Sequence, residues 1–216
     1  MVPFCYRLSP HLVLCDPEYP YAPGPEERVL HLASRGAFNP THPCTRLCLD
    51  LLKEVLAVAP VRSFLDLGCG AGVLGLAAAA LGVPRVVGVD LARDAARITR
   101  ENARANGLAG QIAVLQGSSE SLKGPFDLAA ANLHLEVQLQ KAEELERLAA
   151  TRGRLILSGF RENQEEALLA VYRERGWSLG RRLVKGFSHP ELPRDLSFTW
   201  AAWLLARGRG SGMGRG

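Results

Sequence analysis

The sequence predicts an α/β fold: a doubly wound, seven-stranded, mostly parallel sheet with an antiparallel edge. Three observations support this prediction. Apolar strand-like runs alternate with helical segments between residues 61 and 176, the arrangement of a parallel sheet covered by helices on both faces. One of these runs passes directly into a loop with alternate glycines, at 68, 70 and 72. Two further strand-like segments, 177–184 and 196–205, end the folded part of the chain and are expected to pair antiparallel.

The segment before this alternation is rich in proline. Residues 6–9 and 11–15 have the composition of a short hairpin or of edge strands, and residues 16–25 read as an irregular, stiff loop. Tyr19 and Tyr21 in this loop either border a substrate entrance or belong to a strap across the sheet. An amphipathic helix is expected over residues 47–58, with Thr41 or Thr45 as its cap.

The remaining elements follow in regular order. Strands are expected at 61–67, 85–90, 112–115, 126–131 and 154–160, and helices at 73–81, 92–106, 135–150 and 162–175.

The strand that ends at the glycine loop carries Asp66 in an otherwise apolar run. The glycines at 70, 72 and 75 match the dinucleotide pattern GxGxxG, with Asp90 twenty residues beyond the first of them. A fixed carboxylate two residues before the first glycine, Gly68, repels a pyrophosphate. It suits a cofactor with a cationic end and no phosphate, such as S-adenosylmethionine, and we favour that cofactor over a dinucleotide.

Other polar residues at predicted strand ends can complete a cofactor site, because ligands bind there in open α/β sheets. Asp90 ends the second strand and can accept hydrogen bonds from two ribose hydroxyls, or it can cap the following helix. Leu91 can pack on an adenine face. Ser118 follows the third strand and can either reach an adenine amino group or serve the turn.

The fourth strand ends at Asn132, which is expected to face the donor methyl group. A neutral carboxamide offers an oxygen that orients an amine nucleophile without protonating it. The next residues are Leu-His-Leu instead of the Pro-Pro-Tyr of enzymes that methylate adenine or glutamine, so a flexible lysine or N-terminal amine fits better than a planar base. His134 is either a base or a structural residue, and His42, in the turn with Thr41 before the first long helix, is expected to touch the cofactor.

Several of these segments together resemble the PrmA-type ribosomal protein (L11) methyltransferases, which are class I, Rossmann-like methyltransferases. The resemblance covers roughly residues 36–207. It rests on the Thr-His-Pro turn and helix start at 41–49, the glycine loop at 65–74, the Gln-Gly-Ser at 116–118, the Ala-Asn-Leu at 131–133, and the segments 153–159 and 200–205. The resemblance implies that S-adenosylmethionine is held by His42, Asp66, Gly68, Gly70, Asp90, Ser118 and Asn132, with Asn132 beside the methyl group. The residues themselves add Thr41, Gly72 and Leu91 to the expected cofactor site, and they give Asn132 and His134 as candidates for catalysis.

The chain departs from that family at its amino-terminal end. Phe38 is followed by Asn39 and Pro40, where the family has Phe-Gly-Thr-Gly. Members of the family carry a separate amino-terminal substrate domain, and the residues before the motif are too few for a domain with its own core. We therefore expect a proline-rich strap at 1–35, a methyltransferase domain at 36–207, and a disordered Gly/Arg tail at 208–216.

The charge, hydropathy and cysteine content of the chain predict its partners and its compartment. The net charge is +4, and much of it comes from tail arginines, so nucleic-acid binding is expected only weakly through the tail. No leader or membrane-spanning run is visible, which predicts a cytoplasmic protein without membrane contact. Five cysteines without a CxxC pair indicate free thiols and no metal site.

The sequence thus predicts an S-adenosylmethionine-dependent N-methyltransferase that acts on a protein amine, with a ribosomal protein as a candidate substrate. Three alternatives stay open: a methyltransferase for RNA or a small molecule, an NAD-dependent oxidoreductase, and a non-catalytic cofactor-binding protein.

Overall fold

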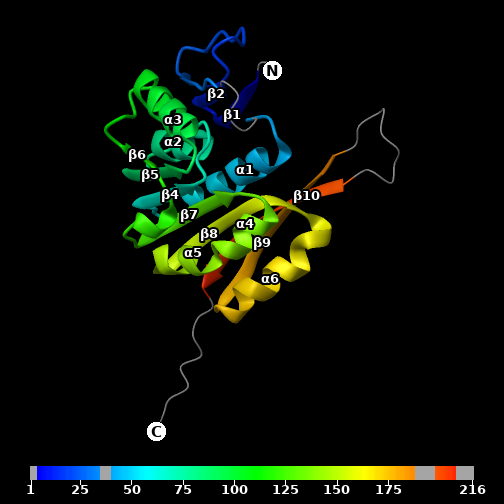
Figure 1. The fold of residues 1–216 in the computed structure, drawn as a ribbon. Coiled ribbons are helices and arrows are strands. Elements are labelled where there is room, and N and C mark those ends of the chain that lie inside the picture. Colours follow the sequence, from blue (N-terminus) through cyan, green and yellow to red (C-terminus); the bar gives the residue numbers. More distant parts are fainter. Residues whose placement is uncertain (1–3, 35–39, 188–197, 208–216) are drawn as a thin grey trace.

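The computed structural model, which describes residues 4–34, 40–187 and 198–207, contains a seven-stranded sheet and a separate three-stranded sheet (Figure 1). The larger sheet has the order β6-β5-β4-β7-β8-β10-β9. Its strands are β4 (Ser63–Leu67), β5 (Arg85–Asp90), β6 (Ile112–Gln116), β7 (Phe126–Asn132), β8 (Ala149–Arg161), β9 (Trp177–Phe187) and β10 (Phe198–Arg207). Strands β4 to β8 run parallel, and β10 pairs antiparallel with both β8 and β9. The predicted sheet and its antiparallel edge are confirmed.

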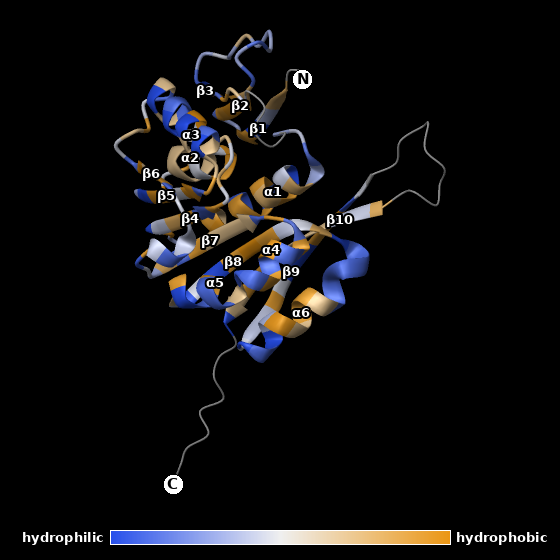
Figure 2. Ribbon diagram, in the orientation of Figure 1, coloured by the Kyte–Doolittle hydropathy of each residue, from blue (hydrophilic) through white to orange (hydrophobic). Residues whose placement is uncertain are grey.

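Helices cover both faces of this sheet. One face packs against α1 (Pro43–Val58), α2 (Val73–Ala80) and α3 (Arg93–Ala105), and the other against α4 (Leu135–Gln140), α5 (Ala142–Leu148) and α6 (Glu165–Glu174). Neighbouring residues of β4 show the division, because Phe64 belongs to the first apolar core and Leu65 to the second. In Figure 2, hydrophobic colour runs along β7 and β8 in the centre of the sheet. Such strands, buried on both faces, explain the continuous apolar runs of the sequence.

The amino-terminal residues form the three-stranded sheet of β1 (Cys5–Ser9), β2 (Leu12–Cys15) and β3 (Arg28–His31). β1 and β2 make the predicted hairpin, whereas β3, which pairs parallel with β2, was not predicted. Leu14 and Leu30 of this sheet belong to the same apolar core as α1 and α2. The sheet therefore packs on the helical layer beside the larger sheet.

The expectation of five free thiols is wrong for one pair. Cys5 and Cys15 lie directly opposite each other in the hairpin register and form a disulfide. The sequence spacing gave no sign of this pair, because register alone brings the two residues together. Cys44, Cys48 and Cys69 are free and buried, as expected.

Two helix predictions are also corrected. Helix α1 begins at Pro43, a favoured first position, and its N-cap is His42 in place of Thr41 or Thr45: the His42 Nδ1 accepts a hydrogen bond from the Cys44 N–H at 3.2 Å. The helix predicted at 135–150 is divided at Lys141, whose ψ of 2° departs from helical values, and its last two residues belong to β8. No proline or glycine marks this break in the sequence.

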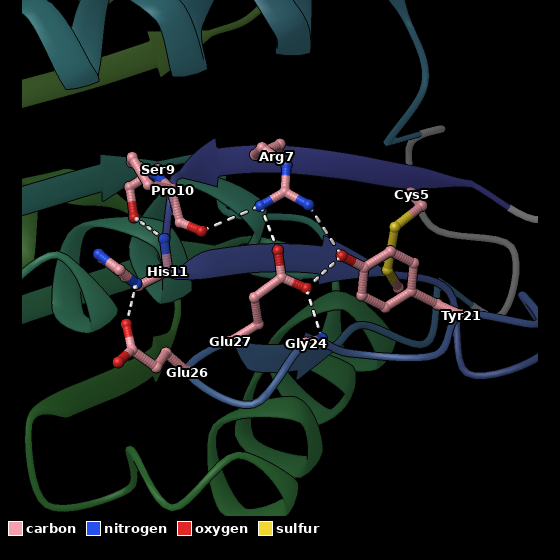
Figure 3. Close-up of polar contacts among 10 residues, drawn as sticks. Cys5, Arg7, Ser9, Pro10, His11, Tyr21, Gly24, Glu26 and Glu27 are labelled. Carbon is pink, nitrogen blue, oxygen red and sulfur yellow. Dashed lines mark hydrogen bonds and ion pairs between the residues drawn. A yellow bond between two sulfur atoms is a disulfide. The ribbon is translucent and has the colours of Figure 1, made fainter.

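The proline-rich loop lies away from the centre of the larger sheet. Figure 3 shows Tyr21 donating a hydrogen bond to Glu27, with Arg7 bound to both. These contacts assign Tyr21 to the outer side of the amino-terminal sheet. Residues 188–197, between β9 and β10, and the tail at 208–216 lie outside the described residues, as do Phe38 and Asn39. Among the helices that the structure describes, none has the length and apolar character to cross a membrane.

Candidate functional site

A cavity of about 480 Å³ lies at the carboxyl ends of β4, β5 and β7. The chain crosses from β6 at one edge to β7 on the other side of β4, so this is the point where the strand order reverses. Open α/β sheets bind ligands at such a point. The first turn of α1 and the start of β10 close the cavity, through His42, Thr45 and Trp200.

Most of the predicted site residues meet in this cavity. The lining includes His42, Asp66, Gly68, Gly70, Asp90, Leu91, Ser118, Asn132 and His134. Thr41 and Gly72 are not in the lining: Thr41 lies in the turn before α1, and Gly72 is the N-cap of α2, with a φ of 83°. Lining residues without a predicted role include Thr45, Leu133, Val137, Lys141, Gly159 and Trp200. Gly159 and Trp200 lie within segments that carry the family resemblance, which is the one signal that pointed to them.

Two glycines let the chain pass close to Leu133. Gly68 has a φ of +73°, and a Cβ there would lie 2.4 Å from the Leu133 Cδ2. Gly159 has a φ of +98°, and its Cβ would lie 2.3 Å from the Leu133 carbonyl oxygen. A larger residue at Gly159 would displace the backbone of the segment that follows β7, whereas one at Gly68 would displace the Leu133 side chain. These glycines therefore shape the cavity wall beside Asn132.

Asp66 is buried beneath the glycine loop, with 3% of its surface exposed. Its Oδ2 accepts a hydrogen bond from the Gly75 N–H at 2.9 Å. Burial, together with the nearby Asp90 carboxylate, raises the pKa of Asp66 to about 7, although the Gly75 bond opposes the shift. The carboxylate thus lies at the first turn of α2, where a dinucleotide fold binds pyrophosphate. A cation in the cavity would stabilise the ionised form of Asp66.

Asp90 organises the loop from the neighbouring strand. Its Oδ2 accepts from the Gly70 N–H and its Oδ1 from the Ala92 N–H, each at 2.9 Å. The N-cap of α3 is Ala92, without a side-chain cap bond. Asp90 is therefore not the helix cap that the sequence offered as its alternative role. Leu91 beside it is 71% exposed and presents an apolar side chain at the cavity.

Ser118 lines the opposite end of this wall. Its Oγ accepts a hydrogen bond from the Lys141 Nζ at 3.2 Å, and its carbonyl accepts from the Ser121 hydroxyl. Lys141 also pairs with Glu120 and Glu144. The break between α4 and α5 brings this lysine to the cavity, so Ser118 has both of its expected features, a place in the turn and a hydroxyl at the cavity.

Asn132 lines the cavity and carries an acceptor without a partner among the residues that the structure describes. Its Nδ2 donates to the Thr45 Oγ1 at 3.4 Å, and Thr45 is buried in the first turn of α1. Its Oδ1 is buried and has no hydrogen-bond partner in the structure. A buried acceptor without a partner costs free energy unless a ligand supplies a donor. The Asn132 oxygen is therefore an acceptor at the cavity wall that a donor from a bound molecule would satisfy.

Two histidines stand at the same end of the cavity. His42 contacts the edge of Trp200, with ring centroids 4.7 Å apart. Burial, with a smaller effect from His134, lowers the pKa of His42. His134 is the N-cap residue of α4, but its side chain makes no cap bond, and the residue is exposed. Within residues 4–34, 40–187 and 198–207, no group of three or more His, Cys, Asp or Glu side chains is placed to hold a metal ion.

Comparison with known proteins gives a consistent result. A family model described as ribosomal protein L11 methyltransferase (PrmA) matches residues 6–186. The chain is 37% identical over 172 residues to the ribosomal protein L11 methyltransferase of Syntrophotalea carbinolica, covering 79% of this chain and 56% of that protein. It is 37% identical over 184 residues to that of Geobacter sulfurreducens, covering 80% and 60%. The chain thus spans less than two thirds of the length of these relatives.

Solved structures share the fold. The crystal structure of a ribosomal protein L11 methylase from Lactobacillus delbrueckii subsp. bulgaricus has a TM-score of 0.78 at 25% identity, covering 94% of this chain and 98% of that chain. A putative RNA methyltransferase from Pyrococcus horikoshii has a TM-score of 0.63 at 16% identity, covering 81% and 87%. The second likeness concerns the fold alone.

Proposed function

The chain belongs to the PrmA family of ribosomal protein L11 methyltransferases, and from this premise we propose that it is an S-adenosylmethionine-dependent N-methyltransferase that acts on a protein amine. The acceptor would be a lysine side chain or an N-terminal amine, with a ribosomal protein as the first candidate substrate. The names of the relatives support this choice of substrate, and a ribosomal substrate would place the reaction in the cytoplasm.

The observation that carries the proposal is the unpaired Oδ1 of Asn132. An amine can donate one N–H to this oxygen and direct its lone pair at an electrophile in the cavity. Because a carboxamide is neutral, it orients the amine without holding it as an ammonium ion. The Thr45 Oγ1 accepts from the Nδ2, which leaves the Oδ1 as the acceptor for the amine.

The residues present fit S-adenosylmethionine better than a dinucleotide. Asp66 already occupies the Gly75 N–H at the start of α2 with a carboxylate, so a phosphate there would meet a negative charge. Asp66 can instead pair with the amino group of the cofactor, Asp90 with ribose hydroxyls, and Leu91 and Ser118 with the adenine. When bound, the cofactor supplies a methyl group on a sulfonium, which is a good leaving group, so the main task of the protein is to position the amine.

The two histidines differ in how they can handle the proton that the amine must lose. The His42 Nδ1 accepts the Cys44 N–H, so the neutral ring carries its proton on Nε2 and is a donor toward other groups. No comparable bond restrains His134, which lines the cavity and is exposed to solvent. We assign His134 as the group that takes the proton and passes it to water.

The test is transfer of labelled methyl from S-adenosylmethionine to cell lysate and ribosomes of the source organism, with Asn132→Ala as the control variant. Label in a protease-sensitive band that disappears with the variant would support the proposal and identify the substrate. Label lost on nuclease treatment would move the assignment to RNA. Binding of S-adenosylhomocysteine without any label would contradict a macromolecular substrate, and protection from unfolding by NAD alone would indicate an oxidoreductase.

A further inference from the structure

Two asparagines one helical turn apart, Asn102 in α3 and Asn106 at its C-cap, hold the backbone that leaves β3. The Asn106 Oδ1 accepts from the His31 N–H at 2.8 Å, and its Nδ2 donates to the His31 carbonyl at 2.7 Å. The Asn102 Oδ1 accepts from the Ala33 N–H at 3.1 Å, and its Nδ2 donates to the Ala33 carbonyl at 2.9 Å. Each amide therefore pairs with one residue as a neighbouring strand would. We refer to Asn102 and Asn106 together as the amide clamp.

The spacing of the clamp matches that of the segment it holds. Four residues of helix advance about 6 Å, and two residues of extended chain advance about 6.6 Å. Asn102 and Asn106 are separated by four positions and His31 and Ala33 by two. Since alternate residues of an extended chain direct their N–H and C=O groups to the same side, both amides can be satisfied at once.

Asn102 also reaches the glycine loop of the cavity. Its Nδ2 makes a second donation, to the Ala71 carbonyl at 2.9 Å. The neighbouring Thr99 hydroxyl donates to the Gly70 carbonyl at 2.8 Å. Asn102 is 4% exposed, so its polar atoms depend on these partners instead of water. The buried Asn102 side chain thus joins the amino-terminal segment to Ala71 of the cavity wall.

The amino-terminal sheet is attached to the helical layer mainly along this side and along α1. The Arg28 guanidinium donates to the Asn106 carbonyl at 2.9 Å, and the Tyr6 hydroxyl donates to Asp50 on α1. The other side of the sheet carries the exposed Arg7–Glu27 pair (Figure 3). If the sheet left α3, Asn102 would therefore lose its two hydrogen bonds to the Ala33 backbone.

We propose that Asn102 is a positioning residue for the cofactor, and that docking of the amino-terminal sheet on α3 and binding of the cofactor stabilise each other through the amide clamp. The clamp holds the Ala71 carbonyl, and with it the backbone N–H groups of the glycine loop, in the arrangement that lines the cavity. This inference rests on the proposed function, because it takes S-adenosylmethionine as the ligand of that loop. A partner that binds the docked sheet more tightly than the undocked one would raise the affinity for the cofactor. By linkage, the cofactor would raise the affinity for that partner by the same factor.

The experiment compares the dissociation constant of S-adenosylhomocysteine for three variants of the full chain. Asn102→Ala removes the bonds to Ala33 and Ala71. Asn106→Ala removes the bonds to His31 and one to the Asn102 carbonyl, but leaves the bond to the Ala71 carbonyl in place. Arg97→Ala removes exposed ion pairs of the same helix that touch neither. We expect Asn106→Ala to weaken binding at least ~5-fold, within the usual range of coupling between sites, and Asn102→Ala to weaken it further. Arg97→Ala should bind as the wild type does.

A second measurement needs no variant and covers the case in which Asn102→Ala does not fold. Hydrogen exchange at the His31 and Ala33 amides should slow when S-adenosylhomocysteine binds the wild type, while amides of α6, which contributes no residue to the cavity lining, serve as the internal reference. An unchanged dissociation constant for Asn106→Ala, together with unchanged exchange at these two amides, would overturn the proposal and reduce Asn102 to a local support of the loop. If the wild type binds no S-adenosylhomocysteine, the proposed function itself fails, which is a separate result.

Discussion

The burial of Asp66 makes the sharpest prediction, because it ties stability and cofactor affinity to one carboxyl group. The perturbation is Asp66→Asn combined with a change of pH. An asparagine can still accept the Gly75 N–H through its Oδ1, so the hydrogen bond at 2.9 Å is kept and only the charge is lost. The variant therefore isolates the cost of the buried charge.

The magnitude follows from the pKa. A rise from the ordinary 3.8 to about 7 corresponds to roughly 4 kcal/mol, at about 1.36 kcal/mol for each pKa unit. The folded state binds the proton more tightly than the unfolded state, so between pH 3.8 and about 7 the stability of the cofactor-free protein falls as pH rises. Between pH 5 and pH 8 the fall attributable to Asp66 is roughly 2 to 3 kcal/mol.

The assay is urea unfolding of the cofactor-free wild type and of Asp66→Asn at both pH values. Other groups, including His42, titrate alike in both proteins, so they cancel in the difference. We expect the free energy of unfolding of Asp66→Asn, relative to that of the wild type, to rise by roughly 2 to 3 kcal/mol between pH 5 and pH 8. A difference that does not change with pH would refute the reasoning, because the carboxyl group would then have an ordinary pKa and would not be desolvated.

Cofactor binding should show the opposite dependence. A cationic amino group requires Asp66 to be ionised, so S-adenosylhomocysteine should bind the wild type roughly 50- to 100-fold more weakly at pH 5 than at pH 8. Asp66→Asn should bind weakly at both values. Calorimetry in buffers of different ionisation enthalpy would detect the proton released by the wild type on binding.

Three further predictions concern the other residues of the cavity. Asn132→Ala should lower the rate of methyl transfer at least ~100-fold through loss of positioning while the affinity for S-adenosylhomocysteine stays the same, and a parallel loss of affinity would contradict an acceptor-side role. Gly159 and Gly82 share a φ of +98°, but only at Gly159 would a Cβ lie against a backbone atom, the Leu133 carbonyl oxygen. In urea unfolding, Gly159→Ala should therefore lower the free energy of unfolding by about 1 to 3 kcal/mol more than Gly82→Ala does. Equal losses in the two variants would refute the close approach. His134→Gln should lower kcat/KM roughly 10²-fold and change its pH profile at unchanged S-adenosylhomocysteine affinity, whereas an unaltered profile would mean that water takes the proton.

The sequence was sufficient to predict the part of the site that strand ends create. Asp66, Asp90 and Asn132 each follow an apolar run, and parallel strands bring their carboxyl ends to one edge of the sheet. The apolar residues next to each of these three side chains determine its position at a strand end, so the prediction required no knowledge of contacts with distant segments. The same holds for the positive φ values of the glycine loop, which the glycines themselves indicated.

The rest depends on contacts between distant segments. Trp200 reaches the cavity because β10 pairs with β8, and Lys141 because the helix after β7 breaks at a residue with no breaking tendency. Cys5 and Cys15 meet through hairpin register. From the sequence alone, Asn102 is one of several polar residues of the amphipathic helix α3. Its role is visible only when the extended segment that it pairs with is known. Such side chains take their roles from partners that lie far away in the sequence.

The choice between two cofactors shows how one hydrogen bond can decide what a common fold holds. A strand, a glycine loop and a helix present backbone N–H groups and a positive helix end, which favour an anion. In this chain the carboxylate of Asp66 reaches the Gly75 N–H and supplies that anion from within the protein. The helix end is thereby satisfied, and the free side of the carboxylate faces the cavity, where a positive group is favoured. The same loop that would hold a pyrophosphate is in this way suited to a ligand with a cationic end, and the unpaired Asn132 oxygen marks where the amine would approach it.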